Sequence, residues 1–473
     1  MAREDAMMSV VYSFTWVIAL AVLTGLSADG SVLSKPEKLF SRAVRREREI
    51  KQEQHLNISA LNTALAFETY RDLATKTTTV PGVQQQHNIL FSPMGLASAL
   101  ALLSQISGSE SRSQALEALG LAANSTEQSV EATISALADL QQSLMLQEGG
   151  GGVGVQRAGS VAGAKTEAGI GSTAGGGAGN NASVDNGAKG RNGTGFSSEA
   201  KGHTGSKGGV QAGGQLRVWS SLHVDGKPSL DYDSFLSRPQ HTELSAFNIS
   251  FEPLMKDLQS SDKLTLNNYV YFKGRQPFER RHTVPRSFQL NATTNVEVDM
   301  MFRDYSSEVM MLYDTNCSAT VVQLAFSERL AALLLLPKAE LQPLEDCLSD
   351  SRMSFWLSNL KPGGAEILFP KFQLRKSYSL KSLLRTSGVS SIFSNSADFS
   401  KISQKTLKFI KAPHEVLLEV EETKSSDGGS RDTSLEFFVA PRITFDRPFM
   451  LIIYDNLTGL VLLIGRVLDP TDV

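Results

Sequence analysis

The sequence predicts an α+β fold, with helices mainly in the first third of the chain and strands in its second half. Between residues 61 and 73, and again between 130 and 146, apolar residues recur at the spacing of a helix with one buried face. After residue 215, short alternating or continuous apolar runs are typical of strands. The chain has 473 residues, 41% of them hydrophobic, which is enough for one large core or two medium domains.

The N-terminus predicts export from the cell. Residues 9–23 form an apolar run, and the small residues Gly25, Ser27 and Ala28 follow it. This pattern is typical of a secretory signal peptide, which we assign to residues 1–28. The alternative, a membrane anchor, is disfavoured because the run is shorter than the roughly 20 apolar residues that span a bilayer. We therefore expect a secreted, extracellular protein without a membrane partner.

Charge is nearly balanced, with 46 Lys and Arg residues against 49 Asp and Glu residues. This balance argues against a nucleic-acid partner. Residues 29–58 form a charged N-terminal tail in which Arg42, Arg45, Arg46 and Arg48 lie close together. The arginines fit a processing site or a contact for an anionic polysaccharide, but the favoured interpretation is a solvated, poorly ordered tail.

Asparagine sequons agree with export, because the Asn-X-Ser/Thr pattern is the acceptor for N-glycosylation. The candidate glycosylation sites are Asn57, Asn124, Asn181, Asn192, Asn248, Asn291, Asn316 and Asn456.

Cysteine usage excludes a scaffold held together mainly by disulfides, since the chain has only 2 cysteines, Cys317 and Cys347. A disulfide between them would close a loop of about 30 residues and contribute about 3 kcal/mol. Two free, partly buried thiols are the alternative, because spacing alone does not establish pairing.

The elements follow from hydrophobic periodicity and from glycine and proline positions. The helices are expected near residues 61–73, 96–103, 109–119, 130–146, 353–360 and 380–386. The strands or extended segments are expected near residues 88–92, 216–224, 264–272, 296–301, 320–324, 330–336, 366–374, 450–454 and 460–465.

Residues 149–214 interrupt this pattern with a tract of mostly Gly, Ala, Ser, Asn and Lys. Such a composition buries too little apolar area to offset its ordering entropy, so we predict a disordered insertion. It divides the remaining chain into a mainly helical part, residues 59–148, and a sheet-rich part, residues 215–473. The glycines at 149–154 do not predict a phosphate loop, because no strand precedes them and no helix follows.

Five motifs, in order and at matching spacing, resemble the serpin family. They are NILFSPMGLA at 88–97, LNNYVYFKG at 266–274, SNSADFSKI at 394–402, KAPH at 411–414, and FDRPF at 445–449 with GRVLDP at 465–470. The resemblance covers residues 60–148 and 215–473. It implies three β-sheets, eight or nine helices and an exposed reactive-centre loop.

In inhibitory serpins a protease cleaves this loop, whose first part then inserts as a new strand into the central sheet and distorts the acyl-enzyme. The resemblance places the loop at residues 422–441. The scissile bond would follow Phe437 or Phe438, which suits a chymotrypsin-like protease, although these residues also fit a simple edge strand. The residues that would have to insert, here called the hinge, are Thr423, Lys424, Ser425, Ser426, Asp427, Gly428, Gly429 and Ser430.

Three further positions match the polar shutter that links the central helix of serpins to the sheet: Ser92, Asn268 and His414. For His414 we expect a structural role. The family's second shutter serine is replaced by Gly95, which we expect to weaken the network.

Several departures argue against a working trap. Lys424 and Asp427 stand where inhibitory serpins keep small residues, and burying an unpaired charge costs several kcal/mol. Gln276 replaces a tryptophan that the family keeps after the Phe-Lys-Gly motif. The stretch between residues 251 and 264 is about 20 residues shorter than the expected helix and loops require.

No enzyme is predicted. The sequence has no HExxH pair, no close Cys–His cluster and no nucleophile elbow, so we assign no catalytic residue, metal or cofactor. Two classes remain for a monomeric serpin-like protein. The favoured one is non-inhibitory, with a small hydrophobic ligand, a receptor or matrix as partner, or a role as peptide precursor. The alternative is an inhibitor of a serine protease.

Overall fold

A computed structural model describes residues 57–75, 87–122, 125–147, 213–224, 263–276, 278, 282–305, 308–399, 401, 407–422 and 441–472. The expected signal peptide, the charged tail up to residue 56, the Gly-rich insertion up to residue 212 and loop residues 423–440 lie outside this part of the chain. The expected shortening between residues 251 and 264 also falls almost entirely outside it.

Helices cover the early part of the described chain, as the periodicity predicts. The central one, α3, begins where the Ser92 hydroxyl accepts the Gly95 N–H and where Pro93 occupies the first turn. All but one of its residues are buried, so it forms the middle of the molecule. The helices are one over residues 57–75, α3 (Pro93–Ile106), α4 (Ser109–Ala118), α5 (Glu127–Gln147), α8 (Gln342–Asp346), α9 (Asp350–Asn359) and α10 (Leu380–Leu384), with a 3-10 turn η2 (Ser391–Phe393).

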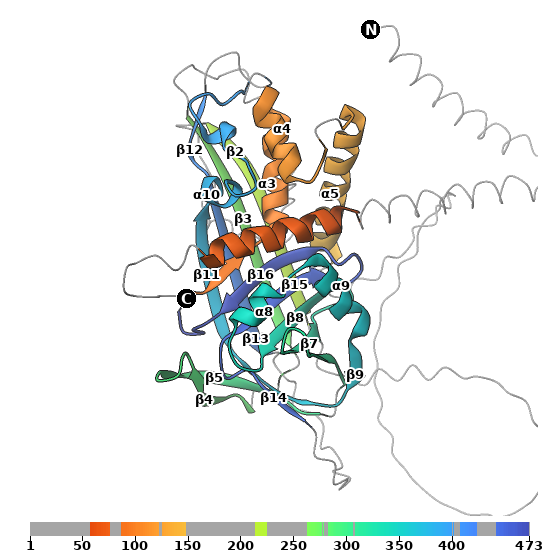
Figure 1. Cartoon of the computed structure of the whole chain (residues 1–473), viewed down its shortest axis with the longest axis vertical. Coiled ribbons are helices and arrows are strands. Elements are labelled where there is room, and N and C mark those ends of the chain that lie inside the picture. The colour runs from red at the N-terminus through yellow and green to blue at the C-terminus, as the bar shows by residue number, and fades with distance from the viewer. Residues whose placement is uncertain are drawn as a thin grey trace, which may run out of the picture.

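The long sheet that runs down the molecule has the strand order β11-β13-β3-β12 (Figure 1). β12 and β13 pair with successive parts of β3, and β2 pairs with β3 along its opposite edge. Its outer strands, β2 and β11, pair antiparallel to their neighbours, whereas β3 pairs in parallel with both β12 and β13. The strands are β2 (Gly213–Val224), β3 (Lys263–Gln276), β11 (Phe372–Ser379), β12 (Lys408–Lys411) and β13 (Pro413–Glu422).

The other two sheets contain seven and four strands. In the seven-stranded sheet, every residue of β8, β15 and β16 is buried, which agrees with their mainly apolar sequences; Asp455 and Arg466 are the charged exceptions. Its order is β1 (Ile89–Phe91), β16 (Val461–Val467), β15 (Phe449–Asp455), β8 (Leu330–Pro337), β7 (Ala319–Ala325), β6 (Val309–Asp314) and β9 (Lys361–Gly363). The four-stranded order is β14 (Arg442–Thr444), β10 (Glu366–Pro370), β5 (Asn295–Arg303) and β4 (Val284–Gln289).

The helix α3 contacts β2 and β3 of the long sheet and β16 of the seven-stranded sheet, so it lies between these two layers. This arrangement brings the start of α3 to the inner face of the long sheet. Three sheets with helices confirm the predicted α+β class. Two boundaries differ. Asn57 and Ile58, expected in the charged tail, belong to the helix over residues 57–75. Gly213 and Gly214, expected in the insertion, belong to β2 and pair with Arg275 and Gly274.

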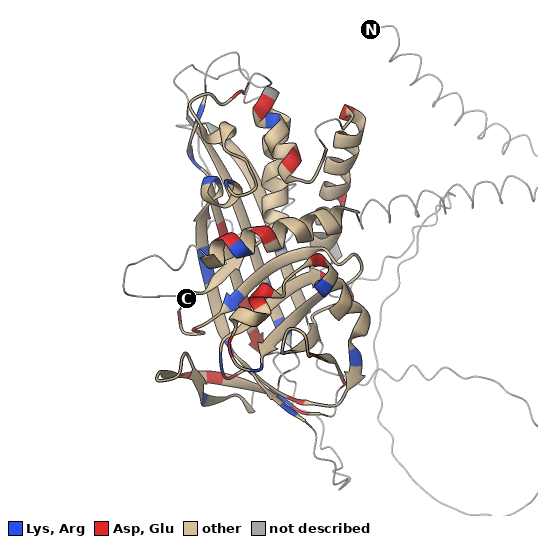
Figure 2. Ribbon diagram, in the orientation of Figure 1, with Lys and Arg blue, Asp and Glu red and all other residues tan. Residues whose placement is uncertain are grey.

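Acidic and basic side chains are interspersed over the described ribbon rather than separated by sign (Figure 2). This distribution agrees with the near balance of total charge. No helix among the described residues is long and apolar enough to cross a membrane.

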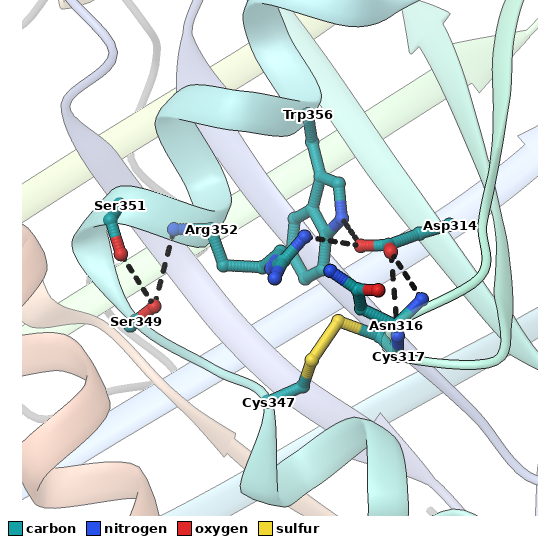
Figure 3. Close-up of a disulfide and its surroundings, with 8 residues drawn as sticks. All are labelled: Asp314, Asn316, Cys317, Cys347, Ser349, Ser351, Arg352 and Trp356. Carbon is teal, nitrogen blue, oxygen red and sulfur yellow. Dashed lines mark hydrogen bonds and ion pairs between the residues drawn. A yellow bond between two sulfur atoms is a disulfide. The ribbon is translucent and has the colours of Figure 1, made fainter.

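A disulfide joins Cys317, in the turn after β6, to Cys347, directly after α8 (Figure 3). The two cysteines are therefore not free thiols. Beside the bond, the carboxylate of Asp314 accepts the backbone N–H of Cys317 at 3.3 Å and the indole N–H of Trp356 at 2.7 Å. Arg352 of α9 lies 3.3 Å from the same carboxylate. The turn is thus attached to the end of α8 by a covalent bond and to α9 by the polar contacts of Asp314.

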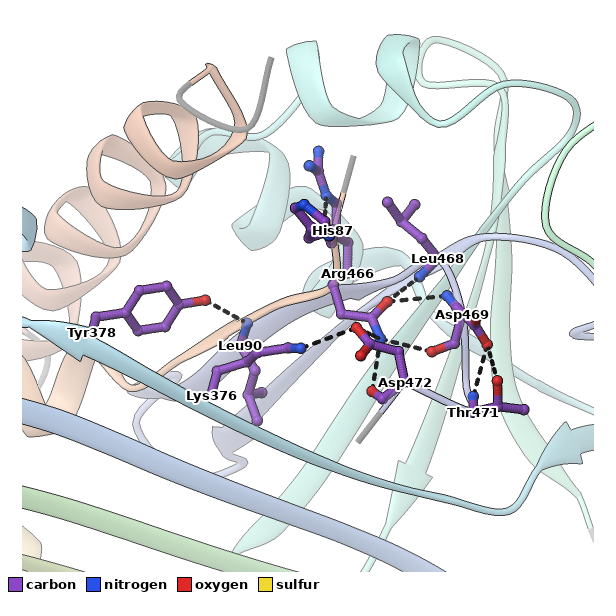
Figure 4. Close-up of polar contacts among 10 residues, drawn as sticks. His87, Leu90, Lys376, Tyr378, Arg466, Leu468, Asp469, Thr471 and Asp472 are labelled. Carbon is purple, nitrogen blue, oxygen red and sulfur yellow. Dashed lines mark hydrogen bonds and ion pairs between the residues drawn. The ribbon is translucent and has the colours of Figure 1, made fainter. Parts of the chain in front are cut away.

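The residues after β16 are held against β1 and β11 (Figure 4). The Asn88 amide donates to the Asp469 carbonyl at 2.6 Å and accepts the Leu468 N–H at 2.7 Å. Asp472 forms an ion pair with Lys376 of β11 at 3.1 Å. The first motif of the resemblance, which begins at Asn88, is thereby joined to the last.

Candidate functional site: the seam between β3 and β13

The candidate site is the boundary between β3 and β13, because β13 ends at Glu422, directly before the predicted hinge. The two strands pair in parallel from His414 opposite Asn268 to Glu422 opposite Gln276. We call these paired segments, residues 268–276 and 414–422, the seam. A strand that turned back after Glu422 would run antiparallel to both neighbours, so the topology would accept it if the seam opened.

At the end of the seam where His414 lies opposite Asn268, the structure brings the three predicted shutter residues together. The Ser92 backbone N–H donates to His414 Nε2 at 3.0 Å. Since Nε2 accepts, Nδ1 carries the proton and donates to the Asn268 side-chain oxygen. The Ser92 hydroxyl donates to the Leu462 carbonyl of β16 at 2.6 Å, which extends the network from the long sheet to the seven-stranded sheet.

Sequence reasoning missed one member of this network, Ser220 of β2. The Asn268 amide donates to the Ser220 hydroxyl at 2.7 Å and to the Gly95 carbonyl at 2.9 Å. Gly95 therefore takes part through its backbone, and Ser220 supplies a hydroxyl from the neighbouring strand. The weakening expected at Gly95 concerns its missing side-chain hydroxyl, and it stays a prediction. Strand alternation is the one sequence signal for Ser220, since it places Ser220 on the inner face with the buried Leu216, Val218 and Leu222.

His414 is fully buried, and this burial lowers its pKa to about 3. Its imidazole is therefore neutral and is fully used by two hydrogen bonds within the fold. Such an arrangement fits the structural role expected for this residue.

On the outer face of the seam, five side chains form a second polar group, here called the seam cluster: Tyr271, Lys273, Arg275, Glu419 and Glu421. Lys273 lies 3.1 Å from Glu419 and 3.1 Å from Glu421, and Arg275 lies 3.0 Å from Glu421. The Tyr271 hydroxyl donates to Glu419 at 2.9 Å. Every one of these contacts joins β3 to β13.

The seam cluster shifts the pKa values of its members. Burial raises the pKa of Tyr271, and the Glu419 carboxylate raises it further. Burial alone would lower the pKa of Lys273, but hydrogen bonds to Glu421 and Glu419 raise it above its usual value. Burial alone would raise the pKa of Glu421, but hydrogen bonds and charge interactions with Lys273 and Arg275 lower it below its usual value. The partners across the seam thus favour the charged forms of Lys273 and Glu421 and the neutral, hydrogen-donating form of Tyr271.

Glu422, the last described residue before the hinge, lies 3.1 Å from Lys371. Hinge residues Thr423 to Ser430, together with Phe437 and Phe438, lie outside the described residues. So do the sequons at Asn124, Asn181, Asn192 and Asn248. The other four acceptors are exposed: Asn57, Asn291, Asn316 and Asn456.

Within the described residues, no group of three or more His, Cys, Asp or Glu side chains could hold a metal ion. A cavity of about 530 Å³ lies between the end of the helix over residues 57–75 and α10. The described residues that line it all carry a polar or charged group: Asp72, Ser379, Lys381, Ser382, Arg385 and Thr386.

Comparison with known proteins adds the family. The family described as Serpin (serine protease inhibitor) matches residues 60–161 and 248–470. An alpha-1-antitrypsin-like protein of Tamias sibiricus is 32% identical over 223 residues, 46% of this chain and 54% of the relative. The alpha-1-antiproteinase of Callosciurus caniceps is 34% identical over 224 residues, 46% of this chain and 53% of the relative. The chain therefore matches about half the length of these curated relatives.

Solved structures agree on the fold. Human thyroxine-binding globulin complexed with thyroxine has a TM-score of 0.59 at 23% identity, with 89% of this chain and 100% of that chain covered. Uncleaved ovalbumin has a TM-score of 0.58 at 17% identity, with 87% of this chain and 100% of that chain covered. At these identities the similarity shows the fold alone.

Proposed function

Because this chain belongs to the serpin family, we propose that it is a secreted, monomeric member that does not trap proteases. It would act instead as a carrier, a peptide precursor, or a protein that binds a receptor or matrix. Export is supported by the N-terminal leader, by the exposed sequons and by the disulfide, since disulfides persist in oxidising compartments.

One observation carries the non-inhibitory part of the proposal: the inner face of the seam is apolar where the hinge would have to enter. Val270 and Phe272 of β3 and Leu418 and Val420 of β13 are all buried and belong to one hydrophobic cluster. Side chains on an inserted strand would alternate between this inner face and the outer face.

Lys424 and Asp427 are three positions apart, so they have opposite parity in a regular strand. Whichever register the hinge adopted, one of these two charges would point into the apolar inner face. Placing an unpaired charge there costs several kcal/mol. Because each 1.4 kcal/mol slows a step about tenfold, insertion would be slow relative to release of the cleaved loop.

The alternative function, inhibition of an extracellular serine protease, has a specific observation in its favour. The relatives at 32% and 34% identity bear the names alpha-1-antitrypsin-like protein and alpha-1-antiproteinase. An aromatic residue at Phe437 or Phe438 would direct such an inhibitor to a chymotrypsin-like target.

Within the non-inhibitory class, the cavity beside α10 bears on the kind of partner. Its described lining combines Lys381 and Arg385 with one carboxylate and three hydroxyl groups. These side chains offer hydrogen-bond and ionic partners to a ligand, beside the apolar surface of their own aliphatic parts. Receptor or matrix binding and the precursor role do not depend on the cavity.

The test is thermal unfolding of the full chain before and after cleavage of the loop by chymotrypsin, with the cut located by mass spectrometry and adducts sought on a denaturing gel. We expect cleavage without an adduct and with a melting temperature changed by only a few degrees. The matched variant Lys424→Gly/Asp427→Ala removes both hinge charges. It should gain tens of degrees on cleavage if those charges are what prevents insertion.

A stable adduct and a rise of tens of degrees in the unaltered chain would overturn the proposal in favour of inhibition. If the variant also gained no stability, the two hinge charges would not be the reason that insertion fails.

A further inference from the structure

The seam cluster spans the one boundary of the long sheet that a new strand would have to open. Lys273 is opposite Glu419, and Arg275 is opposite Glu421, in the parallel register of β3 and β13. The Tyr271 and Lys273 contacts converge on the Glu419 carboxylate, and the Lys273 and Arg275 contacts converge on Glu421. The group is therefore a connected network rather than a set of isolated surface pairs.

These contacts depend on direct adjacency of the two strands. Paired strands lie about 4.8 Å apart, and one inserted strand would roughly double that separation. The short tyrosine hydroxyl contact to Glu419 would then break. The lysine and arginine would have to extend across the backbone of the inserted strand to keep their partners.

The cluster is partly shielded from water. Side-chain exposure is 22% for Lys273, 26% for Glu419 and 32% for Glu421, whereas Arg275 is 58% exposed. Partial burial reduces screening, so the charges interact more strongly than fully exposed ones while still responding to salt. The apolar inner face and the shutter act on the same seam but are insensitive to ionic strength by comparison.

We propose that Tyr271, Lys273, Arg275, Glu419 and Glu421 act as an ionic latch that keeps β3 against β13 and controls how readily the long sheet admits a further strand. The latch deepens the proposed function, because it describes regulation of the same seam. It adds an obstacle that is independent of Lys424 and Asp427. Salt should weaken the latch, whereas it should leave the inner-face obstacle in place.

The test measures entry of a free strand, so that the charges of the chain's own hinge play no part. The probe is a fluorescent synthetic peptide with the sequence of residues 423–430 carrying Lys424→Gly and Asp427→Ala, which leaves it without charged side chains. Its incorporation into the full chain is followed by fluorescence anisotropy and by native gel. The variant is Glu419→Gln/Glu421→Gln, which keeps side-chain size and removes both negative charges of the latch.

The matched control is Glu415→Gln. Glu415 also lies on β13 and forms an ion pair with Arg375, at 3.5 Å, but this pair crosses the β11–β13 boundary, which stays closed when a strand enters the seam. Tyr271→Phe removes one hydroxyl contact only and serves as a milder variant. If the double variant folds poorly, Tyr271→Phe provides the comparison with the unaltered chain instead.

At low ionic strength we expect the double variant to incorporate the peptide at least tenfold faster than the unaltered chain, with Tyr271→Phe intermediate and Glu415→Gln unchanged. In about 1 M salt, where the screening length falls to roughly 3 Å, the unaltered chain should approach the rate of the double variant. Amide hydrogen exchange along the seam should accelerate in the same order.

A rate for the double variant within twofold of Glu415→Gln would overturn the latch, as would a rate in the unaltered chain that does not rise with salt. No incorporation by the double variant at either salt concentration would overturn it too, because another element would then keep the seam closed. No protease takes part in this comparison. An adduct with chymotrypsin would therefore refute the proposed function, whereas the latch is tested only by the incorporation of the peptide.

Discussion

Asn268 and His414 lie directly opposite one another in the parallel pairing of β3 and β13, and a buried hydrogen bond joins the asparagine oxygen to His414 Nδ1. Both residues are 0% exposed. Because the Ser92 N–H occupies the other imidazole nitrogen, the pair also attaches the start of α3 to the sheet. A single neutral imidazole thus links both strands of the seam to the central helix.

Acidification should destabilise the protein through His414. Burial lowers its pKa to about 3, from an ordinary value of 6.5, so between these values the unfolded chain binds a proton that the folded chain excludes. The stability contributed by His414 is complete above about pH 6.5 and is lost progressively as the pH falls toward 3. The loss relative to pH 7 should amount to about 2 kcal/mol at pH 5.

Urea unfolding at pH 7 and pH 5 measures this effect. The variant His414→Asn should be less stable at pH 7 but should lose about 2 kcal/mol less than the unaltered chain between the two pH values. Equal losses in both proteins would show that other groups cause the acid sensitivity.

Replacement of Gly95 should destabilise the shutter, even when the new residue is the serine that the family has at this position. A Cβ atom at this position would lie 2.9 Å from Val270 Cγ2, 3.0 Å from the Asn268 side-chain oxygen and 3.1 Å from His414 Cε1. We expect Gly95→Ser to cost about 1–3 kcal/mol in urea unfolding, because the packed helix and sheet must move apart. Gly213→Ala, where no atom lies within 4 Å, is the control and should be nearly neutral. A stabilised Gly95→Ser variant would contradict the close packing.

Loss of the disulfide should lower stability by about 3 kcal/mol, since the bond closes a loop with a sequence separation of 30. Reduction with dithiothreitol and the double variant Cys317→Ala/Cys347→Ala should give similar decreases in urea unfolding. The double variant should not respond to the reductant, which controls for other effects of the reagent. Stability that reduction leaves unchanged would refute the prediction.

Glu345 should contribute more to stability than its position on the five-residue helix α8 implies. Its carboxylate accepts from Arg466 at 2.8 Å and from the Tyr70 hydroxyl at 2.6 Å, and Arg466 is 1% exposed. Glu345→Ala removes the carboxylate from a buried guanidinium, so we expect a loss of about 3 kcal/mol or more. Tyr70→Phe should cost about 1 kcal/mol, because the ion pair remains. Equal effects of the two substitutions would argue against a central role for the ion pair.

Local patterns in the sequence were sufficient for most elements of the fold. Continuous apolar runs at β8 and β15 and helical spacing within α5 depend only on neighbouring residues, and these elements lie where they were predicted. Boundaries were less accurate: α10 was expected at 380–386 and ends at Leu384, and β2 begins at Gly213. Element ends depend on caps and partner strands, which periodicity does not describe.

By itself, therefore, the sequence determined the α+β class, the serpin resemblance, the shutter residues and the two hinge charges that argue against insertion. Only the tertiary structure decided the disulfide, the part played by Ser220 and the ion pairs across the seam. These contacts join residues 30, 48 and up to 148 positions apart. The physical reason is that such pairs are selected by strand register and by the packing of α3 between two sheets, neither of which is encoded in any local run of residues.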